Sequence, residues 1–303
     1  MSDRTPLAAL IARSAAALQS AHDRGALSFG HGTQNALDEA AWLVLWQLGL
    51  PLDTDMHAHA APLSPEQIAQ VDALMARRIQ SRQPAAYLTQ EAWLQGVPFY
   101  VDERAIVPRS LIAEVLADGR IDVWLGADTH RVLDLCTGNG SLAVLCALAW
   151  PEVEVTGLDL STDALAVAQI NVERHGLSAR IRLGVSDGLQ AAEGVYDLIV
   201  CNPPYVNAQS MAALPAEYRA EPVLALAGGN DGMDFVRQLL RDAPARLSPP
   251  GVLVLEIGNE HDHFVAAFPS LEVTWLPTSA GDTQVLVVTQ DALRAWHAQG
   301  HHP

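Results

Sequence analysis

The first 85 residues carry apolar side chains at spacings of three and four, the period that places them on one face of an α-helix. One such run begins at Leu7, and a second covers residues 36–49. A third begins at Ser64, which can form a capping box with Gln67. This pattern predicts a small helical domain over residues 1–85.

Residues 86–110 differ in character from the helical stretch before them. Residues 87–89 (Tyr-Leu-Thr) and 97–101 (Val-Pro-Phe-Tyr-Val) have the composition of strands, and Gln95-Gly96 between them suits a turn. We therefore expect a short hairpin that links two domains.

From Arg131 onward, strand-like runs alternate with helical stretches. The runs are residues 131–136, 153–159, 180–185, 195–202, 252–257, 272–277 and 284–289. Such alternation predicts an α/β fold with a mostly parallel, doubly wound sheet. The last two runs are joined by the short loop 278–283, which indicates an antiparallel hairpin that closes the sheet. We predict this Rossmann-like, seven-stranded domain over residues 111–303.

The first strand of this domain runs into a glycine-rich turn and then a helix. Gly138 and Gly140 let the backbone approach a ligand closely, and the helix start presents free N–H groups. Asp159 ends the next strand, where a carboxylate can accept hydrogen bonds from both hydroxyls of a ribose. Together they favour a nucleoside-containing cofactor. Ala143 completes a G-x-G-x-x-A pattern, so NAD stays open at this point.

The fourth strand ends in Asn202-Pro203-Pro204-Tyr205, at the sheet edge that also carries the glycine turn. Two prolines lock the backbone in an extended form. A side-chain carbonyl and a backbone carbonyl can then point at one planar –NH₂ group, while the tyrosine supplies a flat face. These hydrogen bonds would orient an amide nitrogen, which is a poor nucleophile, and methyl transfer depends mainly on such positioning.

The Asn-Pro-Pro-Tyr segment resembles the signature of methyltransferases that act on planar amino groups, and residues 132–141 resemble motif I of class I methyltransferases. That resemblance implies S-adenosyl-L-methionine as the cofactor. The cofactor residues that it assigns are Asp134, Cys136, Thr137, Gly138, Asn139, Gly140, Asp159, Asp187, Gly188 and Asn202. The residues that it assigns to catalysis or to the substrate are Asn202, Pro203, Pro204 and Tyr205.

Three of these positions have particular expected roles. Asp134 would face the cationic amino acid part of the cofactor, and Asp187 would lie near the adenine. Cys136 stands where motif I usually has a third glycine, and a cysteine is small enough to keep the turn.

Most of the chain resembles the protein-glutamine methyltransferases that modify translation proteins. The release-factor branch of that family has Pro-Arg-Pro-Glu-Thr-Glu where this chain has Pro108-Arg109-Ser110. This departure and Cys136 both resemble the branch that acts on the third protein of the large ribosomal subunit. Residues 217–222 and 229–232 also fit the family. The resemblance therefore implies methylation of a glutamine side-chain amide in that ribosomal protein, with a release factor as the alternative acceptor.

Charge bears on the choice of acceptor. The chain has 18 basic residues, all arginine, against 35 acidic ones, and its net charge is −17. Residues 86–303 hold 12 arginines against 27 acidic residues, a net charge of −15. Such a surface attracts a basic protein, and it repels the phosphates on which nucleic-acid binding depends. We therefore expect no stable nucleic-acid binding, and an adenine methyltransferase is disfavoured.

Two further classes of protein are disfavoured. An NAD-dependent oxidoreductase would have no use for the Asn-Pro-Pro-Tyr segment, and a non-catalytic assembly factor would not need the glycine turn. Half of the residues are hydrophobic, but no apolar run reaches the roughly 18 residues of a membrane span. The three cysteines form no C-x-x-C pair, so neither zinc nor disulfides are expected. We expect a cytoplasmic enzyme without a metal.

Overall fold

A computed structural model describes residues 5–59 and 61–300 of the protein. The chain forms two compact units. The first contains the chain up to Ala92 together with Pro215–Ala220, and the second contains the remainder. Among the described residues, no helix is both long and apolar enough to cross a membrane.

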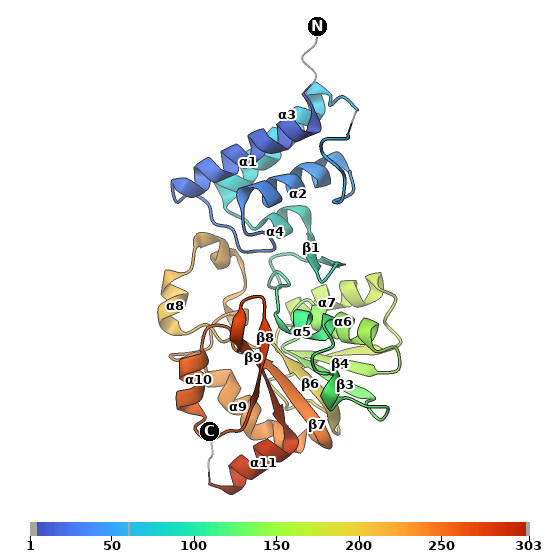
Figure 1. Ribbon diagram of the computed structural model, residues 1–303, viewed down its shortest axis with the longest axis vertical. Helices are drawn as coiled ribbons and strands as arrows, with labels where there is room; N and C mark the ends of the chain where they lie inside the picture. The colour runs from blue at the N-terminus through green and yellow to red at the C-terminus, as the bar shows by residue number, and fades with distance from the viewer. Residues whose placement is uncertain (1–4, 60, 301–303) are drawn as a thin grey trace. The chain divides into compact units, whose positions relative to one another are not determined.

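The first unit is helical, as the sequence predicts (Figure 1). Its elements are α1 (Leu7–Asp23), α2 (Ala36–Leu48), α3 (Pro65–Ser81), α4 (Ala85–Thr89) and the 3₁₀ turn η2 (Ala216–Ala220). Gly49 ends α2 in the left-handed conformation, at φ 66°. Ser64 and Gln67 form the predicted capping box at the start of α3. Leu7, Leu10, Ile11 and Leu18 of α1 are fully buried, so the apolar stripe makes the core of this unit.

The expected strand at residues 87–89 is wrong, because these residues belong to α4. The backbone N–H groups of Tyr87 and Leu88 both donate to the carbonyl of Pro84, at 3.0 and 3.3 Å. All five residues of α4 are buried, and a short apolar run that is buried on every side carries no period that separates helix from strand. The predicted hairpin is present, but its first strand begins at Glu91, after α4.

That hairpin consists of β1 (Glu91–Leu94) and β2 (Val97–Tyr100). Gln95 and Gly96 form its turn, with φ values of 48° and 74°. The boundary between the two units follows Ala92, inside the predicted linker over residues 86–110.

The second unit holds a seven-stranded sheet in the order β5-β4-β3-β6-β7-β9-β8. Its strands are β3 (Arg131–Leu135), β4 (Glu154–Asp159), β5 (Ile181–Val185), β6 (Tyr196–Cys201), β7 (Leu247–Glu256), β8 (Thr274–Thr278) and β9 (Gly281–Thr289). The first five are parallel, and β9 is antiparallel to both β7 and β8. The predicted Rossmann-like sheet with a closing hairpin is therefore confirmed, although β7 begins five residues earlier than expected.

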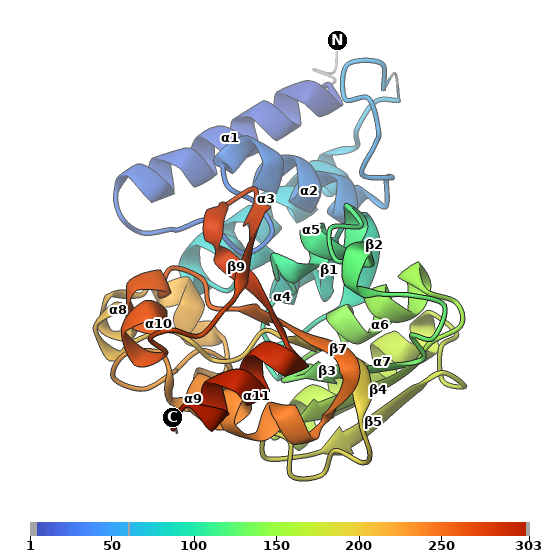
Figure 2. The same cartoon turned by 60° about the horizontal axis from the view of Figure 1, so that its bottom comes forward.

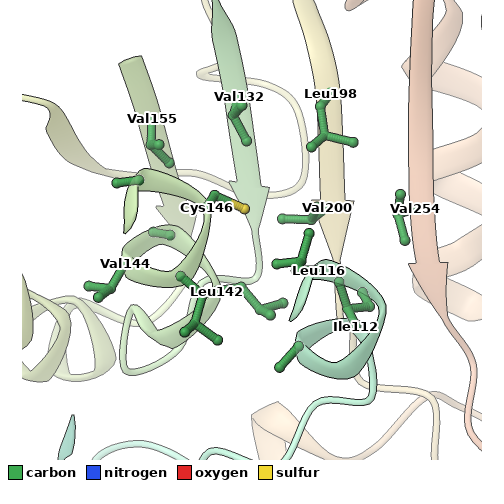
Figure 3. Packing of buried hydrophobic residues seen from close by; sticks show 14 of the residues in the cluster. Ile112, Leu116, Val132, Leu142, Val144, Cys146, Val155, Leu198, Val200 and Val254 are labelled. Atoms are coloured by element: carbon green, nitrogen blue, oxygen red, sulfur yellow. The ribbon is translucent and has the colours of Figure 1, made fainter. Parts of the chain in front are cut away.

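Helices cover both faces of this sheet (Figures 1 and 2). On one face lie α5 (Ile112–Ala117), α6 (Ser141–Ala149) and α7 (Thr162–Arg174), and on the other lie α9 (Asp234–Asp242), α10 (His261–Ala267) and α11 (Gln290–Ala298). Successive strand residues enter opposite cores, since Val132 packs on the α6 side and Leu133 on the α9 side. Figure 3 shows Val132 and Val200 facing the apolar side chains of α5 and α6.

The remaining elements of the second unit are short. They are the helix α8 (Ala208–Ala213) and the 3₁₀ turns η1 (Asp122–Trp124), η3 (Val223–Ala225) and η4 (Ala243–Ala245).

A buried ion-pair cluster holds Pro215–Ala220 within the helical unit. The carboxylate of Glu217, whose side chain is 0% exposed, accepts hydrogen bonds from Nη2 and Nε of Arg82 at 2.8 and 3.1 Å. Nε of Arg78 donates to Glu39 at 2.8 Å in the same cluster. Burial opposes ionisation of Glu217, but its hydrogen bonds, chiefly those from Arg82, outweigh burial and lower its pKa. The segment is therefore fixed by charge as well as by packing.

Replacing Glu217 by alanine should destabilise the protein strongly. The substitution removes the carboxylate with which the buried Arg78 and the partly buried Arg82 both form ion pairs. Loss of one partner of a buried ion pair costs about 3 kcal/mol of folding free energy. Because the folded pKa of Glu217 is lowered, this stabilisation is present at neutral pH and is lost as the pH falls through that value. Denaturant unfolding monitored by circular dichroism measures the change.

The matched control is Asp72→Ala, which removes the exposed ion pair between Asp72 and Arg13. Exposed pairs contribute about 0–1 kcal/mol, so this variant should unfold almost like the wild type. Equal losses in the two variants would contradict the importance of the buried cluster.

Candidate active site

Three adjacent strands end together at one edge of the sheet. Leu135 of β3 pairs with Leu158 of β4 on one side and with Cys201 of β6 on the other. Each of these three residues is followed directly in the chain by a candidate site residue: Cys136, Asp159 and Asn202, respectively. All three line a single cavity.

That cavity encloses about 740 Å³ of space, its open mouth included. Of the residues singled out from the sequence, those that line it are Cys136, Gly138, Asp159, Asp187, Gly188, Asn202 and Pro204. Others that line it include Arg104, Ile106, Leu160, Ser161, Pro222, Leu224 and Phe235. Most of these additional residues are apolar, which suits a flat ligand with an uncharged ring.

The glycine turn, residues 136–140, forms one wall of the cavity. Cys136 and Gly138 have positive φ values of 60° and 54°. The backbone N–H of Gly138 donates to Oδ2 of Asp159 at 2.8 Å, which ties the turn to the end of β4. Gly140 serves packing instead, because a Cβ there would lie 3.0 Å from that of Ala168 on α7. Of the two glycines expected near a ligand, only Gly138 lines the cavity.

Asp134 lies beneath the turn rather than in the cavity wall. Its side chain is buried, and Oδ2 accepts hydrogen bonds from Oγ1 of Thr137 at 2.5 Å and from the N–H of Ala143 at 2.9 Å. Burial raises the pKa of Asp134 to about 7, against the opposing effect of these hydrogen bonds. The carboxyl group thus braces the turn from within the protein interior.

Asp159 has both a structural and a cavity-facing role. Besides Gly138, its carboxylate accepts the N–H of Ser161 at 2.8 Å, and Ser161 itself caps α7. Burial raises the pKa of Asp159, although hydrogen bonds from the backbone N–H groups of Ser161, Gly138 and Leu160 oppose the shift. A carboxylate has four lone pairs, so these bonds leave capacity for a ligand in the cavity that it lines.

Asn139 and Thr137 are buried within the turn and do not line the cavity. The carbonyl of Asn139 accepts a hydrogen bond from Nδ2 of Asn171 at 2.8 Å, and the same nitrogen donates to Tyr100 at 2.9 Å. Asp187 is exposed and borders the cavity. Thr137 and Asn139 therefore shape the turn, whereas Asp187 is accessible to a ligand in the cavity.

The Asn-Pro-Pro-Tyr segment follows β6 directly. Asn202 and Pro204 line the cavity, Pro203 is buried, and Tyr205, which follows Pro204 directly, is half-buried. The phenolic oxygen of Tyr205 donates to Oε1 of Glu256, at the end of β7, at 3.1 Å. Cys201, just before this segment, is fully buried in the core, and burial raises the pKa of its thiol well above the usual value. Cys201 is therefore a core residue.

Arg109 and Glu221 form a bidentate ion pair, with Nη1 and Nη2 at 2.6 and 2.7 Å from the two carboxylate oxygens. Glu221 also accepts the backbone N–H of Val107 at 3.0 Å. Pro222 and Leu224, which line the cavity, follow Glu221 in the chain. The pair therefore anchors one cavity wall, and its members are far apart in sequence, so no local pattern identifies them.

Arg104 also lines the cavity, although no motif in the sequence marks it. Its guanidinium binds Asp102, two residues away, at 2.6 Å, and these hydrogen bonds raise the pKa of Arg104. Asp102 and Arg104 stand two apart in the sequence, a spacing that could have indicated this pair. Among residues 5–59 and 61–300, no cluster of three or more metal-ligating side chains occurs. His301 and His302 lie outside the described residues.

The chain is similar to known proteins over most of its length. Residues 119–217 match a family model described as a methyltransferase small domain. The ribosomal protein uL3 glutamine methyltransferase of Bordetella pertussis is 52% identical over 270 residues, covering 88% of this chain and 90% of that protein. The protein of the same name from Burkholderia pseudomallei is also 52% identical, covering 89% and 91%. That of Neisseria meningitidis serogroup B is 50% identical, covering 88% of each.

Similarity to a solved structure supports the fold alone. The catalytic domain of hMettl16, in complex with MAT2A 3'UTR hairpin 1, aligns with a TM-score of 0.50 at 15% identity. The alignment covers 75% of this chain and 81% of that domain.

The raised pKa of Asp134 predicts an unusual dependence of stability on pH. An unfolded aspartate loses its proton near pH 4, whereas Asp134 in the folded protein retains it until about pH 7. The contribution of Asp134 to stability should therefore fall between these pH values, by on the order of 1 kcal/mol per pH unit, and level off above them. Asp134→Asn should abolish this fall in denaturant unfolding measured from pH 4 to pH 8.

Asp128 is exposed, so Asp128→Asn is a suitable control and should retain the pH dependence of the wild type. Parallel pH curves for the wild type and Asp134→Asn would contradict the assignment of the titration to Asp134.

Proposed function

The chain belongs to the family of ribosomal protein uL3 glutamine methyltransferases, and on that premise we propose that it methylates a glutamine side-chain amide of ribosomal protein uL3 with S-adenosyl-L-methionine as methyl donor. The observation that carries this proposal is the position of Asn202 beside the glycine turn in one cavity. A carbonyl acceptor for an –NH₂ group then adjoins a site suited to a nucleoside.

The residues present fit the cofactor. A Cβ added at Gly138 would meet no heavy atom nearer than the carbonyl oxygen of Cys136, at 3.9 Å, so the turn leaves open space on its cavity side. Asp159 offers carboxylate oxygens for a ribose, and the apolar Leu160 adjoins it. Cys136, Gly138, Asp159, Gly188 and the exposed Asp187 line the cavity and would contact the cofactor. Asp134, Thr137, Asn139 and Gly140 would shape the walls around it.

The main contribution of the protein to the reaction would be to orient the substrate amide toward the methyl group. S-adenosyl-L-methionine supplies an electrophilic methyl group on a sulfonium. The side-chain carbonyl of Asn202 and the backbone carbonyl of Pro203 would accept the two N–H groups of the substrate amide, and this aims the nitrogen at the methyl carbon. Such preorganised acceptors avoid the cost of reorganisation during the reaction. No titrating base is needed before transfer, because the proton can leave after the nitrogen has become cationic.

Charge supports a basic protein as the acceptor. The chain carries a net charge of −17, and such a surface speeds the encounter with a positively charged partner at low ionic strength. The same charge disfavours nucleic acid, whose binding depends on basic side chains. We propose that the helical unit contributes to recognition of uL3, and that the reaction takes place in the cytoplasm, where ribosomal proteins are made.

Tritium transfer from labelled S-adenosyl-L-methionine tests the proposal. Unmethylated uL3 should be labelled, whereas a release factor should not. Asn202→Ala should lower kcat at least about 100-fold, the typical cost of losing one preorganised hydrogen-bonding group, while cofactor affinity measured by calorimetry changes little. Mass spectrometry of the labelled uL3 should place the methyl group on a glutamine.

Gln169→Ala is a control that removes another side-chain amide, on the exposed face of α7. It should keep wild-type activity. Label in the release factor but not in uL3 would assign the chain to the alternative acceptor. Retained cofactor binding with label in neither protein would overturn glutamine methylation altogether.

A further inference from the structure

The ring of Tyr205 is fixed although the residue lies in a loop. Its hydroxyl donates to Glu256, and the ring lies directly against Gly258. A Cβ at residue 258 would lie 2.4 Å from Cε2 and 2.9 Å from Cζ of the ring. Any side chain there would therefore displace Tyr205.

The backbone of Tyr205 is enclosed as closely as its ring. A Cβ at Gly228 would lie 2.7 Å from the Cα of Tyr205, and one at Gly232 would lie 2.2 Å from its carbonyl oxygen. Gly232 and Gly258 also have positive φ values, of 79° and 53°. Three glycines from two separate segments thus form a cradle, and we call Gly228, Gly232 and Gly258 the glycine cradle.

Glu256 is itself held from the opposite side. It is 3% exposed, and its Oε2 accepts hydrogen bonds from Oγ of Ser110 at 2.6 Å and from the N–H of Leu111 at 2.9 Å. Oε1 is thereby directed to the hydroxyl of Tyr205. Because Ser110 and Leu111 fix the carboxyl group of Glu256, this group can in turn fix the position of the Tyr205 hydroxyl. A carboxylate exposed to water would not hold its partner in this way.

We infer that Glu256 and Ser110 are positioning residues, which, together with the glycine cradle, fix the plane of the Tyr205 ring for the substrate amide. This inference rests on the proposed function, because it assumes that a planar amide packs against Tyr205. Its physical reason is that transfer requires close alignment of the reacting atoms, and a displacement of about 1 Å can cost about 100-fold in rate. Neither Glu256 nor Ser110 needs to touch the substrate.

A double-mutant cycle on kcat tests the inference in the full-length protein, with unmethylated uL3 as acceptor. Tyr205→Phe removes only the hydroxyl. Glu256→Met keeps the side-chain length but removes the acceptor of that hydroxyl, together with the acceptor of Ser110 and Leu111. Each should lower kcat about tenfold, with the dissociation constant of S-adenosyl-L-methionine unchanged within about twofold. The double variant should also lose about tenfold, not about 100-fold, because both changes release the same ring.

Two milder variants keep the test decisive if Glu256→Met does not fold. Gly258→Ala retains every hydrogen-bonding group but displaces the ring, so kcat should fall about tenfold. Ser110→Ala should lower kcat about threefold, by loosening Glu256. Its matched control is Ser279→Ala, which removes a similar serine hydrogen bond of 2.6 Å, to Glu114, away from Tyr205. That control should keep wild-type kcat, and thermal unfolding checks that each variant is folded.

Three results would overturn the inference: multiplicative losses in the double variant, full activity of Gly258→Ala, or a loss of cofactor affinity that matches the loss of kcat. Each of these requires an active wild type. A wild type that labels no glutamine of uL3 would instead refute the proposed function, so the two failures are distinguishable.

Discussion

In a parallel sheet, backbone hydrogen bonds bring the carboxyl ends of neighbouring strands to one edge, and the candidate active site depends on this constraint. Leu135 is in register with both Leu158 and Cys201, so β3, β4 and β6 end side by side. The register of the strands alone therefore brings the glycine turn, Asp159 and Asn202 to one cavity. Both faces of the sheet are packed by helices, which resists displacement of one strand relative to the next.

Buried carboxylates convert this edge into a rigid site. Asp134 braces the glycine turn, Glu221 anchors the wall that continues into Pro222, and Glu256 orients Tyr205. Each of the three accepts at least one backbone N–H as well as a side-chain donor. A buried carboxyl group is costly unless such donors surround it. Their hydrogen bonds therefore hold in place the loops that carry the site.

The same principle operates in the helical unit. Glu217 follows the Asn-Pro-Pro-Tyr segment by a dozen residues in the chain, yet its partners Arg82 and Ser28 belong to the N-terminal helices and the loop between them. The loop that leaves the candidate active site thus becomes part of the helical unit before Glu221 returns it to the sheet unit. One continuous segment consequently contributes residues to both units.

Patterns that act over a few residues were readable from the sequence. The capping box at Ser64, the alternation of strands and helices, and the order of glycine turn, Asp159 and Asn202 determined the fold class and the strands that carry the site. The sequence could not separate helix from strand at residues 87–89, because a short run that is buried on all sides has no diagnostic period. It also could not show that Gly140 serves packing and Asp134 lies under the turn, since both match a ligand-binding motif.

Contacts between distant segments were decided by tertiary structure alone. Ser110 and Tyr205 meet at Glu256 across separations of 146 and 51 residues, and Arg109 meets Glu221 across 112. The type of each residue permits many partners, and only the folded chain brings one of them within hydrogen-bonding distance. The sequence by itself determined which chemistry the sheet edge offers. The tertiary structure decided which side chains touch a ligand and which hold the others in place, because burial and distance exist only after folding.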